Sequence, residues 1–519
     1  MTPEAEPPRD RYPWLVLFVL TLVYVLNFVD RQIPSILAER IKGDLGSSDA
    51  QMGFLYGTAF AVFYAVFGIP LGRLADAWVR TRLIALGLAV WSLMTAVSGL
   101  AGSFTALALA RVGVGVGEAS ASPAAYPLLA DWFPEKRRAT VLAIYQSGIH
   151  IGSGIGLGIG GLIVNRWDAA WAAESAPFGL RGWQVAFFVV GLPGLLLALV
   201  VGALREPVRG QSDGIVTAPE PHPFRAFGRE LRAVVPPFGL LHLWLERAGG
   251  AALALNLAAA GSITALAWLC TAWLGTAVQW ICLGIGLYAA VSWAQALQLR
   301  DRVAFALLFR TPSLKWAALA FAALASVQYG LGFWMAPFFI RLRHVPEAEA
   351  GLMLGGIHAL GGWIGVTLGG FLGDRWRRSR PAGRIQVTML TATLPIPLAL
   401  VVLTTPSTTL AYALYFPQSI LAALWAGPAV ATIQDLVLPR MRGIASAAYL
   451  LLVTIVGLAI GPYMIGRLSG AFGDLRLAMI CGLGANLAAL ACALVAARHF
   501  AADETSRLAR ARAAGEPGL

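Results

Sequence analysis

Charged residues are scarce in this sequence. Of its 519 residues only 13% are Asp, Glu, Lys or Arg, whereas 58% are hydrophobic and the mean hydropathy is +0.70. Because soluble domains are about one-quarter charged, this composition excludes a water-soluble protein. Apolar runs of about 20 residues, the length that crosses a bilayer, recur from Trp14 to Val495. They must be helices, since lipid cannot satisfy backbone polar groups.

Residues for several other chemistries are missing or dispersed. No Gly-Lys dipeptide occurs, so the chain lacks the phosphate-binding loop of an ATP-driven pump. His150 and His358 stand on different apolar runs, which argues against an enzyme with clustered catalytic groups. The four cysteines also fall in apolar runs, without spacing for disulfides or a metal site: Cys270, Cys282, Cys481 and Cys492. We therefore predict no cofactor, no metal and no catalytic residue.

The apolar runs form two sets of six on either side of a polar linker that is rich in Pro, Gly and Arg. The expected spans are 13–38, 52–76, 81–102, 104–130, 138–165 and 183–205, then 315–340, 351–375, 384–404, 408–437, 443–468 and 475–498. Two bundles of six helices joined by a linker are typical of a secondary carrier.

An additional apolar stretch lies between the linker and the second set. Residues Ala248 to Leu299 include no charged residue, and a break near Gly275 divides them into two expected spans. This pattern predicts an inserted transmembrane hairpin and about fourteen spans in all, with a hairpin lying in the membrane interface as the alternative. The predicted units are 1–205, 206–235 (linker), 236–312 (hairpin and connection), 313–498 and 499–519 (tail).

The basic residues predict the orientation. Nearly all are Arg, and they gather in loops on one side, at 80–82, 136–138, 205–232, 300–310, 375–384 and 440–442. Positive loops stay on the cytoplasmic side, so we expect a bacterial inner-membrane protein with both termini in the cytoplasm. The net charge of +12 thus reflects topology and not a nucleic-acid partner.

Two loop motifs recur in both halves. Gly72, Asp76 and Arg80 match Gly370, Asp374 and Arg378 in spacing, and Asp131 precedes Arg138 by seven residues as Asp435 precedes Arg442. The stretch from Gly72 to Arg82 resembles the signature loop of the major facilitator superfamily, with Val79 where a second glycine is usual. A carboxylate and an arginine at neighbouring helix ends can latch the bundles in one state. The remaining loop arginines are interpreted as topology anchors only.

Glycine recurs every fourth residue in two expected spans, at Gly148, Gly152, Gly156 and Gly160 and at Gly361, Gly365, Gly369 and Gly373. Such rows let backbones approach closely. The resemblance implies that these two helices meet between the bundles, so we expect the rows to face each other. Close packing that does not move explains them equally well.

Charged residues inside the spans are the main functional candidates. The first span carries Asn27, Asp30 and Arg31, and the fourth carries Arg111 and Glu118, seven residues apart on one helix face. Ionisable groups are costly in a membrane and are usually paired and functional. We expect Asp30, Arg31 and Arg111 in the outer third of the membrane, with the Arg31 side chain reaching Glu118 near its middle. A permanently paired structural network is the alternative.

These strings support a closer resemblance. Asn27 to Arg31, Arg111 to Ser120, Asp131 to Arg138 and Trp425 to Ser446 together resemble the spinster branch of the superfamily, outside the hairpin. The resemblance implies that Asp30 and Glu118 couple protons, that Arg31 and Arg111 bind substrate, and that the substrate is an amphiphilic anion such as a lysophospholipid or sphingolipid-like molecule.

Other intramembrane polar residues are weaker candidates. Gln146, His150, Gln328 and Tyr449 are expected to be mostly helix–helix contacts. His358 is the best of them, because it sits one turn from Gly361 on the same side as that glycine row. Histidine ordinarily titrates near neutral pH, which would suit a proton relay, and we group His358 with Asn27 as candidates for substrate binding.

The sequence therefore predicts an all-α polytopic protein of the major facilitator fold, acting as a monomeric, proton-coupled carrier by rocker-switch alternating access. Its partners would be a small-molecule or lipid substrate, protons and membrane lipids. The alternative is a proton symporter of small organic acids of the hexuronate or aromatic-acid type, and a remote one is a non-transporting receptor. An apolar cavity wall would favour a lipid; a second cation facing the first would favour a small acid.

Overall fold

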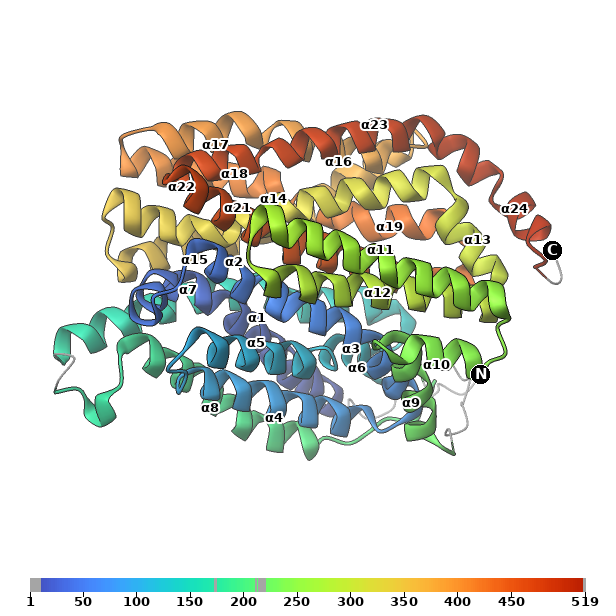
Figure 1. Ribbon diagram of the computed structural model, residues 1–519, viewed down its shortest axis with the longest axis horizontal. Helices are drawn as coiled ribbons and strands as arrows, with labels where there is room; N and C mark the ends of the chain where they lie inside the picture. Colours follow the sequence, from blue (N-terminus) through green and yellow to red (C-terminus); the bar gives the residue numbers. More distant parts are fainter. Residues whose placement is uncertain (1–10, 172–174, 211, 213–220, 517–519) are drawn as a thin grey trace, which may run out of the picture.

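The computed structural model describes residues 11–171, 175–210, 212 and 221–516, and within them the chain is built from helices. The first ten residues, part of the predicted linker (213–220) and the last three residues of the tail lie outside the described residues. Figure 1 shows the helices running along the long axis, with the N-terminal half (α1–α8) below the C-terminal half (α14–α23) and the green α11 and α12 across the front.

The N-terminal half follows the predicted spans. Its helices are α1 (Tyr12–Leu45), α2 (Asp49–Tyr56), α3 (Thr58–Ala77), α4 (Arg80–Ser98), α5 (Phe104–Glu118), α6 (Ala121–Trp132), α7 (Glu135–Ala170) and α8 (Gly182–Gly202). The start of α1 meets the end of α8, where the Arg205 amide donates to Tyr12 Oη (2.6 Å). We call this end of the molecule the linker face and the opposite end the far face.

The C-terminal half repeats this plan. Its helices are α14 (Pro312–Arg343), α15 (Glu347–Arg377), α16 (Gly383–Thr393), α17 (Pro395–Thr404), α18 (Thr408–Ala423), α19 (Ala426–Asp435), α20 (Arg442–Leu452), a π-helix (Val453–Leu458), α21 (Ala459–Phe472), α22 (Leu475–Gly482) and α23 (Gly484–Thr505). The short α24 (Arg507–Ala513) follows.

Thirteen helices of the described residues are long and apolar enough to cross a membrane. The remaining predicted span, 104–130, is present as α5 and α6, each too short to cross alone, with a break at Ala119 and Ser120. The matching span of the other half breaks similarly between α18 and α19. The fold is thus that of an all-α polytopic membrane protein.

The segment between the halves contains α9 (Pro223–Val234), α10 (Phe238–Leu245), α11 (Gly250–Leu274), α12 (Ala277–Arg300) and α13 (Arg302–Arg310). The predicted break lies at Gly275 and Thr276, which turn the chain with positive φ of 71° and 55°. Both α11 and α12 have the length and composition of membrane spans.

A buried polar contact attaches α11 to α12. Asn256, the buried residue of α11, donates to Gln295 Oε1 (2.6 Å) and accepts from Tyr288 Oη (2.7 Å). In turn, α12 bridges the two halves, because Gln279 accepts from Thr58 of α3 and donates to the Ala459 carbonyl of α21. A fully apolar α11 would have no comparable interhelical hydrogen bond to hold it in lipid.

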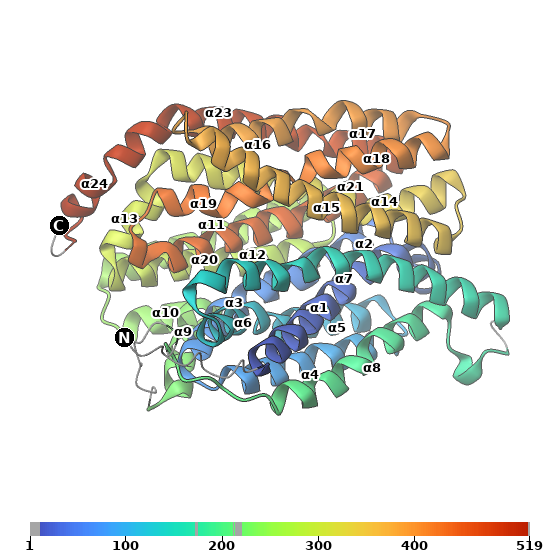
Figure 2. The same cartoon turned by 180° about the vertical axis from the view of Figure 1, so that it is seen from behind.

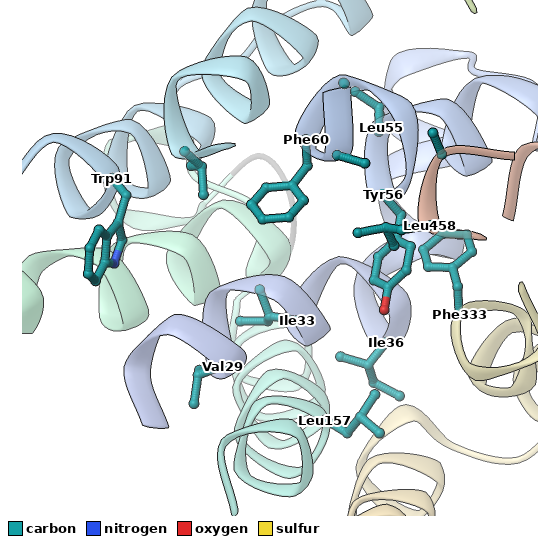
Figure 3. Packing of buried hydrophobic residues seen from close by; sticks show 14 of the residues in the cluster. Val29, Ile33, Ile36, Leu55, Tyr56, Phe60, Trp91, Leu157, Phe333 and Leu458 are labelled. Atoms are coloured by element: carbon teal, nitrogen blue, oxygen red, sulfur yellow. The ribbon is translucent and has the colours of Figure 1, made fainter. Parts of the chain in front are cut away.

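The halves meet in their far-face portion through close-packed side chains. Tyr56 of α2 stacks on Phe333 of α14, with ring centroids 4.5 Å apart, and Leu458 lies beside them (Figure 3). Ser35 of α1 donates to the Phe333 carbonyl (2.6 Å). These contacts close the space between the halves on this side.

The first helix runs to Leu45, seven residues beyond the expected end, so Asp30 and Arg31 lie near the middle of α1 as a whole. Their depth in the membrane stays a prediction. Pro34 does not end the helix, and the polar residues after Ala38 continue it toward the ion pairs of the far face.

The predicted facing of the two glycine rows is wrong. A Cβ at Gly152 would meet Val25 and Phe28 of α1, and one at Gly365 would meet Ile420 of α18. Each row therefore packs against a helix of its own half. Spacing alone identifies a close-packed face but not the neighbour that covers it.

Other glycines make the contact between α7 and α15, which lie side by side in Figure 2. A Cβ at Gly355 would lie 2.5 Å from the Gly154 carbonyl, and one at Gly351 would lie 2.4 Å from the Leu157 carbonyl. Only glycine permits this approach of the two backbones.

We expect Gly355→Ala to destabilise the protein by about 1–3 kcal/mol, because the added methyl group overpacks the α7–α15 contact. The adjacent Gly356 offers a matched control, since a Cβ there meets nothing within 4 Å. Thermal unfolding in detergent should give a lower Tm for Gly355→Ala than for Gly356→Ala. Equal Tm values would contradict this account of the contact.

Candidate functional site: a cavity with two arginines

A cavity of about 700 Å³ lies between the halves. Its wall extends from the middle of the molecule toward the linker face as far as Ala143 of α7 and Val430 of α19. The charged side chains among its described lining residues are Arg31 and Arg111, and no Asp, Glu or Lys lines it. The cavity thus presents positive charge to whatever occupies it.

Arg31 is held in a defined position. Its Nε donates to Glu118 Oε2 at 2.6 Å, and its side chain is 16% exposed while that of Glu118 is fully buried. The guanidinium carbon lies 4.6 Å from the ring centroids of both Phe60 and Tyr64, and 4.9 Å from that of Phe28. Aromatic faces and a carboxylate therefore support the guanidinium from behind while it remains accessible from the cavity.

Arg111 and Asp30 form the second part of the network. Nη1 of Arg111 donates to the backbone carbonyl of Asp30 (3.3 Å), and both side chains are buried. Several buried polar atoms here have no hydrogen-bond partner among the described residues: Asp30 Oδ1, Arg111 Nε and Nη2, Glu118 Oε1 and both amide atoms of Asn27. Such a concentration is unusual in a structural core and is typical of a site that binds a proton, water or substrate.

Local sequence places Glu118 in this position. It is the last residue of α5, immediately before the break. A Cβ at Gly115 would lie 2.6 Å from the Phe60 carbonyl, and one at Gly117 would lie 2.7 Å from the Trp91 amide nitrogen. The alternate glycines thus let α5 press against α3 and α4, which brings the carboxylate to Arg31.

The opposite wall of the cavity is neutral and largely apolar. His358 Nε2 lies 3.0 Å from Tyr415 Oη, and Gln328 Oε1 accepts from Trp425 Nε1 (3.0 Å). His150 of α7 lies across from His358, since a Cβ at Gly362 would approach its ring to 2.5 Å. The other lining residues of the C-terminal half include Val327, Trp363, Val366, Ala422, Leu450, Val453 and Leu483.

Sequence reasoning ranked several of these residues too low. Gln146, His150, Gln328 and Tyr449 line the cavity with His358. Gln418 and Asn486 also line it and were not singled out. Their signal, a lone polar residue in an apolar helix, is the same as that of an ordinary interhelical hydrogen bond, so only their placement identifies them.

Ion pairs join the halves on the far face. Arg341 of α14 donates to Glu39 of α1 (2.6 Å) and to Asp49 of α2 (2.7 Å). Arg40 of α1 donates to Glu347 of α15 (2.8 Å). Together with the packed rings of Figure 3, these pairs close the far side while the cavity extends toward the linker face.

The loop motifs of the N-terminal half are only partly brought together. Arg80 is buried and donates to Asp131 (2.6 Å) and to Glu206 (2.7 Å). Arg138 donates to the Ala130 carbonyl (3.2 Å). The Asp76 side chain is exposed, and its backbone carbonyl accepts from an arginine of the linker. Gly72 lies on α3 one turn before it, against Pro123 of α6.

In the C-terminal half a different arginine makes the corresponding contacts. Arg384 donates to both Asp374 (2.7 Å) and Asp435 (2.5 Å). The predicted partners Arg378 and Arg442 are exposed, and no Cβ contact restrains Gly370. The repeat spacing therefore identified Asp374 and Asp435 as members of this cluster, but it did not identify Arg384, which binds both of them.

Comparison with known proteins agrees with this architecture. The family model described as Major Facilitator Superfamily matches residues 20–462. The chain belongs to this superfamily. Its fold, two helical halves around a central cavity, and its place among transporters rather than enzymes follow from that membership.

Individual relatives narrow the branch. A crystal structure of a bacterial homologue of the human lysosomal transporter Spinster, inward-facing and occupied, is 26% identical, covers 95% of this chain and 98% of its own, and superimposes with a TM-score of 0.69. An MFS-type efflux pump of Mycolicibacterium smegmatis (strain ATCC 700084 / mc(2)155) is 27% identical over 91% of this chain and 88% of its own. The protein is a spinster-like transporter.

A third relative matches a smaller part of the chain. The probable galactarate/D-glucarate transporter of Bacillus subtilis (strain 168) is 31% identical over 206 residues, which are 38% of this chain and 42% of its own.

The Arg31–Glu118 pair should behave as a coupled unit. Arg31→Gln leaves a buried carboxylate without its counter-ion, so we expect a loss of about 3–5 kcal/mol of stability. The double variant Arg31→Gln/Glu118→Gln should recover part of that loss, because no charge remains. Thermal unfolding of the wild type, both single variants and the double variant in detergent measures the interaction free energy between the two residues. If the stability losses of the two single variants simply added in the double variant, the pairing would be contradicted.

Proposed function

We propose that this protein is a proton-coupled carrier of amphiphilic anions, working by rocker-switch alternating access between units 1–205 and 313–498. The observation that carries the proposal is the charge of the cavity, where Arg31 and Arg111 face the interior and the carboxylates of Asp30 and Glu118 lie behind them. An anion entering the cavity therefore meets two cations before any carboxylate.

If a substrate anion replaced Glu118 as the partner of Arg31, substrate binding would be coupled to protonation of Glu118. A substrate anion on the cavity side of Arg31 competes with Glu118 for the guanidinium. A buried carboxylate that loses its counter-ion takes up a proton, because an isolated charge is unstable in apolar surroundings. Substrate binding and proton binding then favour each other, as required for coupled transport. Asp30 beside Arg111 would serve the same exchange at a second position.

The shape of the cavity favours an amphiphile over a small acid. Both arginines belong to the N-terminal half, and the facing wall offers neutral groups such as His358 and Tyr415 in place of a second cation. Much of the remaining wall is apolar, which suits a hydrocarbon tail. The alternative, a symporter of small sugar acids, is favoured by the partial similarity to the galactarate/D-glucarate transporter.

We further propose the bacterial inner membrane as its location, with the linker face and both termini in the cytoplasm. The arginine-rich loops at 80–82, 300–310 and 375–384 support this orientation. The cavity would then be open to the cytoplasm, and the ion pairs of Arg341 would close the outer side.

Flux of labelled lysophosphatidylglycerol in proteoliposomes with an imposed pH gradient tests the proposal. Wild type should move the lipid with the gradient. Glu118→Gln and Asp30→Asn should keep binding but lose the dependence on pH. Arg31→Gln should reduce flux at least tenfold. Asp44→Asn and Arg181→Gln are matched controls, since these residues pair with each other on the far face and do not line the cavity.

Each other outcome identifies a competing function. Flux of glucarate with no flux of the lipid would establish the sugar-acid alternative and overturn the amphiphile. Lipid flux that does not respond to pH in wild type would overturn the proton coupling. Tight binding without flux of either compound would indicate a receptor.

A further inference from the structure

A second cavity, of about 310 Å³, lies where the hairpin meets the C-terminal half. One wall comes from α12 and α13, and the other comes from α14, α19, α20 and the π-helix. Because α12 and α13 provide part of the wall, the cavity depends on the segment that the sequence identified as an insertion. We call it the side pocket.

The side pocket is a slot that follows the helix axes. Lys315 lines it three residues into α14, at the linker face, whereas Ile455 lies thirteen residues from the start of α20. On α20 and the π-helix the lining runs from Ala445 to Val456, which spans about 16 Å at about 1.5 Å per residue. Leu287, in the middle of α12, lines the same deep end. The slot thus extends from the linker face toward the middle of the membrane span.

The chemistry of the slot changes from one end to the other. Every described lining residue is aliphatic or aromatic except Lys315, whose side chain is exposed at the rim. Arg310, just before α14, is also exposed, and neither cation has a carboxylate within ion-pair distance in the described part of the chain. The carboxylate of Asp503 nearby accepts from the Ser313 amide and caps α14 instead. The pocket therefore combines an apolar interior with an uncompensated positive rim.

One helical segment separates the side pocket from the central cavity. Tyr449 lines both spaces, Val453 lines the central cavity, and Ile455 lines the side pocket. The two sites are therefore adjacent and share Tyr449, whereas their other described lining residues differ.

We propose that the side pocket binds one acyl chain of an anionic membrane lipid, with the phosphate of that lipid on Lys315. The slot runs along helices that have the length and composition of membrane spans, so its occupant comes from the bilayer. A cation at the end of a span, level with the head groups, attracts anionic lipids specifically. This site goes beyond the proposed function, because it lies outside the central cavity and requires no transport.

Native mass spectrometry of the purified protein tests this with phosphatidylglycerol and phosphatidylcholine of identical chains. Wild type should retain phosphatidylglycerol in preference, and Lys315→Gln should reduce that preference about fivefold. Ala448→Phe, which fills the slot, should abolish retention of the bound lipid. The controls are Lys42→Gln, whose lysine pairs with Asp49 on the far face, and Ala258→Phe, on the exposed side of α11.

A chain-length series in wild type provides a measurement that no folding defect can affect. The preference for phosphatidylglycerol over phosphatidylcholine should persist at every chain length that fits the slot, because the chain moves from one apolar environment into another and the head group decides the difference. Equal retention of both lipids by wild type, or equal effects of Ala448→Phe and Ala258→Phe, would overturn the proposal. The double variant Arg31→Gln/Glu118→Gln, which leaves no unpaired charge, should keep the bound lipid; its loss in a variant that still unfolds cooperatively would place the lipid in the central cavity and overturn a separate site. If the protein failed to transport lipid, the proposed function would be contradicted, but the lipid retention measured here would not change.

Discussion

The ion pair between Arg31 and Glu118 is the constraint on which the rest of the site depends. A carboxylate with no solvent exposure cannot stay charged in an apolar helix bundle without a counter-ion, and the 2.6 Å contact supplies one. The Arg31 side chain of α1 reaches Glu118 at the end of α5, and the glycines before Glu118 hold that carboxylate in place by letting α5 pack against α3 and α4. Aromatic rings fix the guanidinium where it reaches both the carboxylate and the cavity. The position of the Arg31 guanidinium, its charge and its exposure to the cavity therefore all depend on the pair with Glu118 and the surrounding rings.

Packing in lipid explains why glycine is so prominent elsewhere. Hydrophobic burial drives helices together weakly in a bilayer, so close backbone contact must supply the attraction. Here the two faces of α7 use glycine for different contacts: Gly152 lies against α1 within its own half, and Gly154 lies against α15 of the other half. The glycines of α7 that include Gly152 contact α1, and those offset by two residues, such as Gly154, contact α15, so one helix packs closely against two neighbours. The first contact holds one half together, and the second is a close contact between the two halves.

Sequence reasoning predicted the spans, the hairpin and the pairing of Arg31 with Glu118, because length, hydropathy and intramembrane charge are local signals. Sequence reasoning failed where the role of a residue depends on which other helix packs against it. Arg384 bridges two carboxylates without belonging to the repeated motif, and nothing in the spacing of Arg378 reveals this. His150 and Tyr449 have the same sequence context as a structural polar residue, and only the cavity distinguishes them. The end of the first helix was placed too early because α1 continues beyond its apolar portion.

The hairpin changes how the two halves can separate. Gln279 of α12 contacts Thr58 of α3 and the Ala459 carbonyl of α21, so one inserted residue bridges both halves beside the closed far side. Any state that opens the far side must break one of these bonds in addition to the ion pairs of Arg341. The hairpin has further attachments, since Asn256 joins α11 to α12 and Arg467 of α21 donates to the Leu274 carbonyl at the end of α11 (2.6 Å). In the proposed alternating-access cycle, the insertion would add a contact that must be broken and remade, and it gives the closed far side an interaction that twelve helices alone would lack.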